Sequence, residues 1–129
     1  KIVFNIRYST ETNAEEIKSR ILHILDTSDN DYNITWKHSG EPFLTTNNYF
    51  MDICKQSIKE VTKLNTVVST NGGTSDGRFM AKICEQVIEL GLTNRSIHKI
   101  DECVRENDLH VLVEIYKKIL SKVFLRINK

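Results

Sequence analysis

The sequence contains only one proline and three cysteines, and it has no long apolar run and no excess of charge of either sign. A membrane-spanning helix needs about 20 consecutive apolar residues, and a signal peptide needs a longer apolar stretch than residues 1–7 provide. With 18 basic and 17 acidic residues, no strong field attracts nucleic acid or anionic lipid. These absences favour a cytoplasmic protein that binds neither membrane nor nucleic acid.

The cysteines also argue against two common small scaffolds. Cys54, Cys84 and Cys103 are odd in number and widely spaced, so they suggest neither a disulfide framework nor the C-x-x-C pairs of a zinc ribbon. We expect three reduced, buried thiols. The composition, 40% hydrophobic and 27% charged, is that of a soluble globular domain with one modest core.

Residues 1–38 have the pattern of a β-α-β unit. Residues 2–8 are rich in β-branched and aromatic side chains, as in a strand. Thr12 and Glu15 then form the S/T-x-x-E pattern of a capping box, ahead of apolar residues at helical spacing. Residues 32–37 alternate apolar and polar side chains, which indicates a strand with one buried face. Because the chain is strand-like from its second residue and lacks an initial methionine, its start is expected to cut through a folded region.

The rest of the chain also mixes the two periodicities. The expected helices cover 48–63, 79–83 and 109–124, and the expected strands cover 66–70 and 86–90. The last helix is the clearest, because its apolar residues form one stripe. The predicted fold class is therefore α/β, in the form of an α+β fragment.

The chemistry concentrates in the glycine-rich loop 71–78. Gly73 to Gly77 fits the G-x-S-x-G nucleophile elbow, with Ser75 as the nucleophile of a serine hydrolase. The later residues available as its base and acid are His98, His110 and Asp101. The chain has too few strands for an α/β-hydrolase sheet, however. The alternative is a turn in which Ser75 or Asp76 caps the following helix.

The same loop also suits an anion. Its glycines let backbone N–H groups face outward beside a helix N-terminus, and Arg78 adds a cation that can hold a carboxylate through two hydrogen bonds. The lysine of a Walker A loop is absent, so a carboxylate is favoured over a nucleotide. His98 has no second ligand at metal-site spacing, and the residue pattern alone favours a surface or core histidine.

Three segments closely resemble the bacterial succinyl-diaminopimelate desuccinylase family, which is zinc-dependent and M20-type. They are Thr70 to Phe79, with its G-G-T-S-D-G-R string, Glu89 to Gly91, and Asn94 to Cys103. Residues 4–10 and 39–44 look like the same family, so the resemblance covers nearly the whole chain. Related zinc deacylases, such as acetylornithine deacetylase, carry a different loop at the position of that string.

The resemblance implies a fold in two parts and a reaction. Residues 1–38 would be the last β-α-β of a ferredoxin-like β-α-β-β-α-β lid domain, which also forms a homodimer. Residues 39–129 would be the C-terminal part of a zinc-peptidase-like catalytic domain. The implied reaction is hydrolysis of N-succinyl-L,L-diaminopimelate to succinate and L,L-diaminopimelate, a step in diaminopimelate and lysine biosynthesis.

The resemblance also implies roles for particular residues. The family uses two zinc ions, which polarise the amide carbonyl and lower the pKa of a water molecule, while a glutamate accepts the proton of that water. His98 matches the last zinc ligand. The implied substrate-binding residues are Arg7, Gly73, Thr74, Arg78 and Asn94.

The remaining zinc ligands and the glutamate belong to the N-terminal half of the family's sequence, which this chain lacks. The chain is therefore expected to be an inactive fragment. Its expected partners are a small-molecule substrate, the missing half of the enzyme and a second copy in a homodimer. A self-standing dimerisation module is the alternative from a different class of protein.

Overall fold

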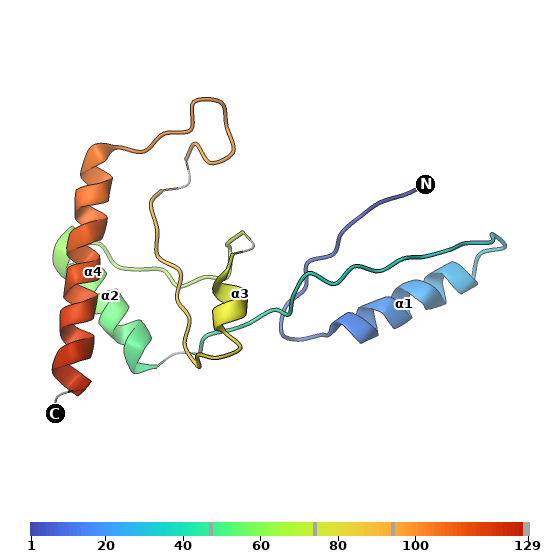
Figure 1. Cartoon of the computed structure of the whole chain (residues 1–129), viewed down its shortest axis with the longest axis horizontal. Coiled ribbons are helices and arrows are strands. Elements are labelled where there is room, and N and C mark those ends of the chain that lie inside the picture. Colours follow the sequence, from blue (N-terminus) through green and yellow to red (C-terminus); the bar gives the residue numbers. More distant parts are fainter. Residues whose placement is uncertain (47, 74, 94, 128–129) are drawn as a thin grey trace. The chain divides into compact units, whose positions relative to one another are not determined.

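A computed structural model describes residues 1–46, 48–73, 75–93 and 95–127 (Figure 1). The helices within them are α1 (Ala14–Asp26), α2 (Tyr49–Thr62), α3 (Gly77–Met80) and α4 (Glu106–Ile127). The other described residues are irregular or form turns, and none of them pairs in a β-ladder. Each helix predicted from the sequence is confirmed, although α3 ends early and α4 starts three residues before the predicted position.

The chain forms two compact units. Unit 1 comprises Lys1–Leu44 and Thr74–Glu85, and unit 2 comprises Thr45–Gly73 and Gln86–Lys129. The chain therefore passes between the units three times. Across the described ranges, no helix has both the length and the apolar character that crossing a bilayer requires.

The N-terminus of α1, in unit 1, is fixed by two side chains. Asn13 is the N-cap and accepts the N–H of Glu16 at 2.9 Å, while Thr12 Oγ1 donates to Glu16 Oε2 at 2.8 Å. The predicted capping box is thus wrong by one residue, because the side-chain oxygen of Asn13 is a favoured acceptor at this position. After α1 the chain reverses, and Tyr32 Oη donates to Asp26 Oδ1 at 2.5 Å.

The two strands predicted in unit 1 are wrong. Residues 2–8 and 32–37 are irregular, although Ile34 and Trp36 are half-buried while Thr35 between them is exposed. Alternation decides which side chains can face a core, but a strand also needs a neighbouring strand about 4.8 Å away. No described residue supplies one, and the described part of unit 1 contains no buried residue.

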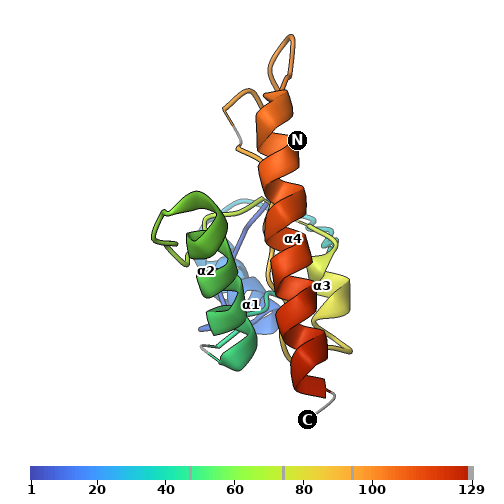
Figure 2. The same cartoon turned by 90° about the vertical axis from the view of Figure 1, so that its left-hand side faces the viewer.

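Unit 2 is held together by α2, which packs along α4 (Figure 2). Cys54, Ile115 and Ile119 form the buried cluster between the two helices and are only 5–6% exposed. The half-buried residues around it are Phe50, Ile53, Ile58, Val61, Ile88, Leu90, Val111 and Val123. Burial of this apolar surface is the main favourable contribution to the stability of unit 2.

Polar groups fix the ends and the rim of this helix pair. Asn48 accepts the N–H of Met51 at 3.2 Å and caps α2, and Lys63 ends the helix at φ 62°, a left-handed conformation common at helix C-termini.

Glu60 lies 2.7 Å from the Lys122 ammonium and 3.3 Å from that of Lys118. The hydrogen bonds from Lys122 and then Lys118 lower the pKa of Glu60. These ion pairs join α2 to α4.

The two strands predicted in unit 2, residues 66–70 and 86–90, are wrong as well. In the second segment, side chains occupy the backbone groups that a neighbouring strand would use. Thr45 Oγ1 accepts the N–H of Val87 at 3.0 Å and donates to its C=O at 2.5 Å. Tyr116 Oη donates to the C=O of Leu90 at 2.7 Å. Such side-chain bonds compete with regular secondary structure.

The expectation of three buried thiols is confirmed for one cysteine only. All three cysteines are free, but Cys84 and Cys103 are exposed, because each lies in an irregular segment that no apolar layer covers. Burial raises the pKa of the Cys54 thiol. Cys54 is therefore a protonated, unreactive part of the core.

Candidate functional site

The predicted substrate loop passes from unit 2 into unit 1. Ser75 Oγ accepts the N–H of Gly77 at 3.0 Å, so this serine stabilises the turn before α3. Asp76 occupies the N-cap position, but its side chain makes no capping bond. The helix has only four residues, so its dipole contributes little to anion binding at this turn.

This geometry does not favour a nucleophile elbow at Ser75. An elbow requires a strand that leads directly into the serine. Residues 66–70 are irregular, and the Ser75 hydroxyl oxygen is bonded to Gly77. The serine-hydrolase interpretation therefore lacks its structural context in the described residues.

Arg78 is held in place by its neighbours in unit 1. Its Cζ lies 4.6 Å from the centre of the Phe79 ring, which gives a cation–π contact. A Cβ built at Gly40 would lie 3.0 Å from Arg78 Cδ, so the side chain fills the space that this glycine leaves. The Nε–H of Arg78 is buried and has no acceptor among the described residues. The side chain is thus held in one place, and its guanidinium charge suits the carboxylate-binding role predicted for it.

Tyr8, His38 and Glu41 form a polar cluster that was not predicted from the sequence. Tyr8 Oη donates to Glu41 Oε2 at 2.9 Å and lies 3.0 Å from His38 Nε2. Since the hydroxyl has a single proton, the second contact requires His38 Nε2 to be the donor. Partial burial and the Glu41 hydrogen bond raise the pKa of Tyr8. The cluster ties the segment that carries Arg7 to the segment that carries Gly40.

One signal in the sequence could have located this cluster. Tyr8 ends the first predicted strand of unit 1, and His38 directly follows the second. The two strands of a β-α-β unit run parallel, so their C-terminal ends are expected to lie on the same side of the unit. Tyr8 and His38 lie together although no ladder forms. The stacking of the two rings, with centroids 6.5 Å apart, reflects that proximity.

His98 lies in unit 2, in a loop that Ser96 closes. Ser96 Oγ donates to the C=O of Cys103 at 2.7 Å and accepts its N–H at 3.0 Å. Within this loop His98 is exposed, has φ 60°, and donates its N–H to Glu102 Oε2 at 3.4 Å. Left-handed backbone at a residue other than glycine is uncommon and is enriched at functional positions. The loop therefore presents the imidazole outward.

His98 is a suitable zinc donor but does not form a metal site by itself. A zinc ion takes three or four protein ligands. Among the described residues no group of three His, Cys, Asp or Glu side chains could hold a metal ion. Any zinc bound through His98 would therefore need ligands from elsewhere.

The other predicted site residues are only partly described. Arg7 is exposed in unit 1, and Gly73 is exposed in unit 2 beside Gly72, where an added Cβ would lie 3.7 Å from Glu89 Oε2. Thr74 and Asn94 lie outside the described residues.

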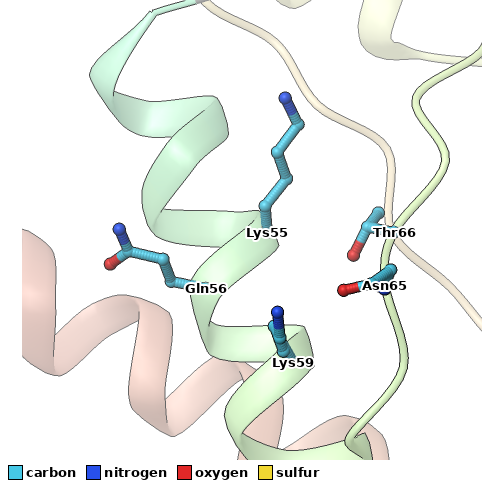
Figure 3. A pocket seen from close by; sticks show the side chains of 5 residues that line it. All are labelled: Lys55, Gln56, Lys59, Asn65 and Thr66. Carbon is cyan, nitrogen blue, oxygen red and sulfur yellow. The ribbon is translucent and has the colours of Figure 1, made fainter.

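A separate opening lies between α2 and the segment that follows it. Its volume is about 200 Å³, and it is lined by Lys55, Gln56, Lys59, Asn65 and Thr66. The oxygens of Asn65 and Thr66 point toward the helix (Figure 3). None of the residues predicted for the site lines this opening, and it contains no carboxylate or imidazole for acid–base chemistry.

Comparison with known proteins places nearly the whole chain in one sequence family. Residues 3–122 match the profile of Peptidase family M20/M25/M40. Over 123 residues the chain is 50% identical to a succinyl-diaminopimelate desuccinylase of Vesicomyosocius okutanii, a match that covers 95% of this chain and 33% of that protein.

Other relatives with the same name give similar values. The Acinetobacter baylyi protein is 49% identical over 95% of this chain and 32% of its own length. The Pseudomonas syringae protein is 50% identical over 94% of this chain and 32% of its own length. The chain thus spans about a third of the length of the curated relatives that it matches.

Proposed function

Because the chain belongs to peptidase family M20/M25/M40, we propose that it is part of a zinc-dependent hydrolase that converts N-succinyl-L,L-diaminopimelate to succinate and L,L-diaminopimelate. The observation that carries the proposal is 50% identity, over 95% of this chain, to a protein named for that activity. A match of this kind supports a shared reaction better than a shared fold would.

In this proposal the chain supplies substrate contacts and one metal ligand. Arg78, positioned by Phe79 and Gly40, binds a substrate carboxylate together with Arg7. Backbone groups at Gly73 and Thr74, and the Asn94 amide, complete the polar contacts. His98 supplies one imidazole to the metal, while the other ligands and the carboxylate base come from the part of the enzyme that this chain does not match. Zinc, when bound, would polarise the amide carbonyl and activate water.

The proposal also assigns parts of the chain to domains. Residues 1–38 belong to a ferredoxin-like lid that forms a homodimer in the cytoplasm, and residues 39–129 belong to the catalytic domain. No described residue of unit 1 is buried. This supports the proposal that further strands complete the core of the domain to which this segment belongs. The chain alone is inactive, because a single imidazole does not make a zinc site.

The test is a joined protein, in which this chain replaces the matched third of the Acinetobacter baylyi relative. The rate of succinate release from N-succinyl-L,L-diaminopimelate is compared with the rate of acetate release from N-acetyl-L,L-diaminopimelate. The acetyl compound lacks the succinyl carboxylate. We expect turnover of the succinyl substrate, a lower kcat/KM for the acetyl compound, and no turnover by the chain alone. A folded, zinc-loaded joined protein that releases no succinate would refute the proposal.

A further inference from the structure

The polar cluster of Tyr8, His38 and Glu41 joins two segments of unit 1 that have few other links. Tyr8 Oη donates to Glu41 Oε2 at 2.9 Å and lies 3.0 Å from His38 Nε2. The imidazole also lies 3.6 Å from the other carboxylate oxygen of Glu41. Residues 2–8 and 32–37 form no ladder, and none of the described residues of unit 1 is buried. Side-chain contacts therefore have a large share in holding the two segments together.

The first segment carries Arg7, the residue directly before Tyr8. Arg7 is exposed, and its side chain has several rotatable bonds. Because the two residues share a planar peptide unit, the bonds of the Tyr8 hydroxyl also restrict the backbone from which the guanidinium extends. The polar cluster thus limits where the charge of Arg7 can lie.

The second segment shapes the space that Arg78 fills. Gly40 lies within this segment, between the two cluster residues that it contributes. A Cβ built at Gly40 would lie 3.0 Å from Arg78 Cδ and 3.6 Å from Arg78 Nε. Arg78 is half-buried, and its guanidinium carbon lies 4.6 Å from the centre of the Phe79 ring. A shift of residues 38–41 would therefore move the arginine.

Arg7 and Arg78 both lie in unit 1, so the polar cluster influences the distance between their charges. A side chain that binds a ligand must be held within about 0.5 Å of its working position by neighbouring contacts. We propose that the three residues of the polar cluster are positioning residues, which hold Arg7 and Arg78 at the spacing that the substrate carboxylates require. The proposal rests on the proposed function, because that function makes both arginines substrate-binding residues.

A role in stability alone explains the polar cluster less well. The side chains of His38 and Glu41 are 39% and 59% exposed, and exposed polar pairs contribute little to folding stability. Unit 1 also contains a comparable bond away from both arginines, in which Tyr32 Oη donates to Asp26 Oδ1 at 2.5 Å. That bond joins residues six positions apart, whereas the Tyr8 hydroxyl joins residues about thirty positions apart. Tyr32 is therefore a matched control for Tyr8.

Tyr8→Phe in the joined protein tests the proposal. The substitution keeps the ring and removes the hydroxyl that makes both bonds. The KM for the succinyl substrate should rise about two- to tenfold, the factor that corresponds to the loss of one hydrogen bond, while kcat changes by less than about twofold. Tyr32→Phe removes a hydroxyl with a similar partner and should leave both constants unchanged. Circular dichroism shows whether the two variants are folded.

A pair of substitutions at His38 tests the same contact from the other side. His38→Gln keeps an N–H donor for the Tyr8 hydroxyl, whereas His38→Leu removes it. His38→Gln should therefore keep a KM close to that of the unsubstituted joined protein, and His38→Leu should raise KM as Tyr8→Phe does. This pair decides the result if Tyr8→Phe does not fold.

Removal of Arg7 distinguishes positioning from general damage to unit 1. Once Arg7→Ala has taken away one guanidinium, the spacing of the two charges no longer affects binding. Addition of Tyr8→Phe to Arg7→Ala should then change KM by less than about twofold, since residues that act through one another have effects that do not add. A purely structural role would raise KM by the same factor with and without Arg7.

The outcomes separate this inference from the proposed function. Three results would overturn the inference and leave the function intact: a folded Tyr8→Phe protein with an unchanged KM, an equal rise of KM in Tyr32→Phe, or equal effects of Tyr8→Phe with and without Arg7. A folded, zinc-loaded joined protein without substitutions that releases no succinate would overturn both.

Discussion

Arg78 lies so close to Gly40 that it occupies the space that a side chain at position 40 would need. A Cβ built at position 40 would lie 3.0 Å from Arg78 Cδ. The glycine thereby sets the path of the guanidinium, which lies over the Phe79 ring. A residue predicted to bind substrate is thus positioned by a residue about forty positions earlier in the chain.

Gly40→Ala should raise the KM of the joined protein for the succinyl substrate without a comparable loss of kcat. Moving Arg78 off its preferred rotamer costs about 0.5–1.5 kcal/mol, which corresponds to about a two- to tenfold rise in KM. Gly91→Ala is the matched control, because a Cβ there meets no atom within 4 Å. An unchanged KM in Gly40→Ala would mean that Arg78 does not touch the substrate.

Ser75→Ala should leave most of the turnover of the joined protein. The serine supports a turn by accepting the Gly77 N–H, and loss of one such hydrogen bond costs about 0.5–1.5 kcal/mol of stability. Thermal unfolding and kcat are measured on the same preparation. Complete loss of turnover, together with an acyl adduct on Ser75 in the wild-type protein, would restore the serine-hydrolase mechanism.

His98→Ala should lower the zinc content of the joined protein and remove most of its activity. His110→Ala serves as the control, since His110 is an exposed imidazole on α4. Metal analysis and succinate release are compared for the two variants, with circular dichroism to show that both are folded. Full zinc occupancy with near-normal turnover in His98→Ala would reduce this histidine to a structural role.

Acid should weaken the packing of α2 on α4 in the isolated chain. Hydrogen bonds from Lys122 and Lys118 lower the pKa of Glu60 from its ordinary value of 4.5. A carboxyl group with a lowered pKa contributes stability above its unfolded pKa, and that contribution is lost as pH falls through the folded pKa. Helical circular dichroism during thermal unfolding should therefore show a drop in stability below about pH 4.5.

The Glu60 prediction has an internal control. Glu60→Gln should be less stable at neutral pH and should lose part of the acid dependence. Glu114→Gln removes a carboxylate that pairs with Lys117 inside α4 and should change the acid dependence less. Equal acid profiles for wild-type protein and Glu60→Gln would contradict the prediction.

Ser57→Ala should stabilise unit 2. Ser57 is fully buried in α2, and its Oγ has no hydrogen-bond partner among the described residues. A buried polar atom without a partner costs about 1–3 kcal/mol, so its removal should raise the melting temperature of the isolated chain. Ser69→Ala, at an exposed position, should change it little. A fall in stability for Ser57→Ala would show that the hydroxyl has a partner in solution.

Helices were predictable here because their signals are local. Apolar periodicity and a capping side chain lie within a few residues of each other. The predicted range 48–63 therefore differs from the observed bounds of α2 by one residue at each end. Strands were not predictable, because their stability depends on partners distant in the sequence. The alternation at Ile34 and Trp36 correctly indicated a half-buried face, but it carried no information about a neighbouring strand.

The packing around the predicted site residues was not predictable from the sequence. The left-handed backbone of His98 and the contact of Gly40 with Arg78 depend on geometry that no residue spacing encodes. The Tyr8–His38–Glu41 cluster joins residues about thirty positions apart. Such contacts between distant residues are fixed by the path of the chain, which a local pattern does not specify.

The chain crosses between the two units three times, and this has a consequence for how the sequence can change during evolution. The segment Thr74–Glu85, which carries Ser75 and Arg78, leaves unit 2 and returns to it as a short excursion. The packing of α2 against α4 uses none of its residues. Substitutions or length changes within this segment therefore leave the α2–α4 core unchanged. If the segment binds substrate as proposed, new specificities can arise on an unchanged scaffold.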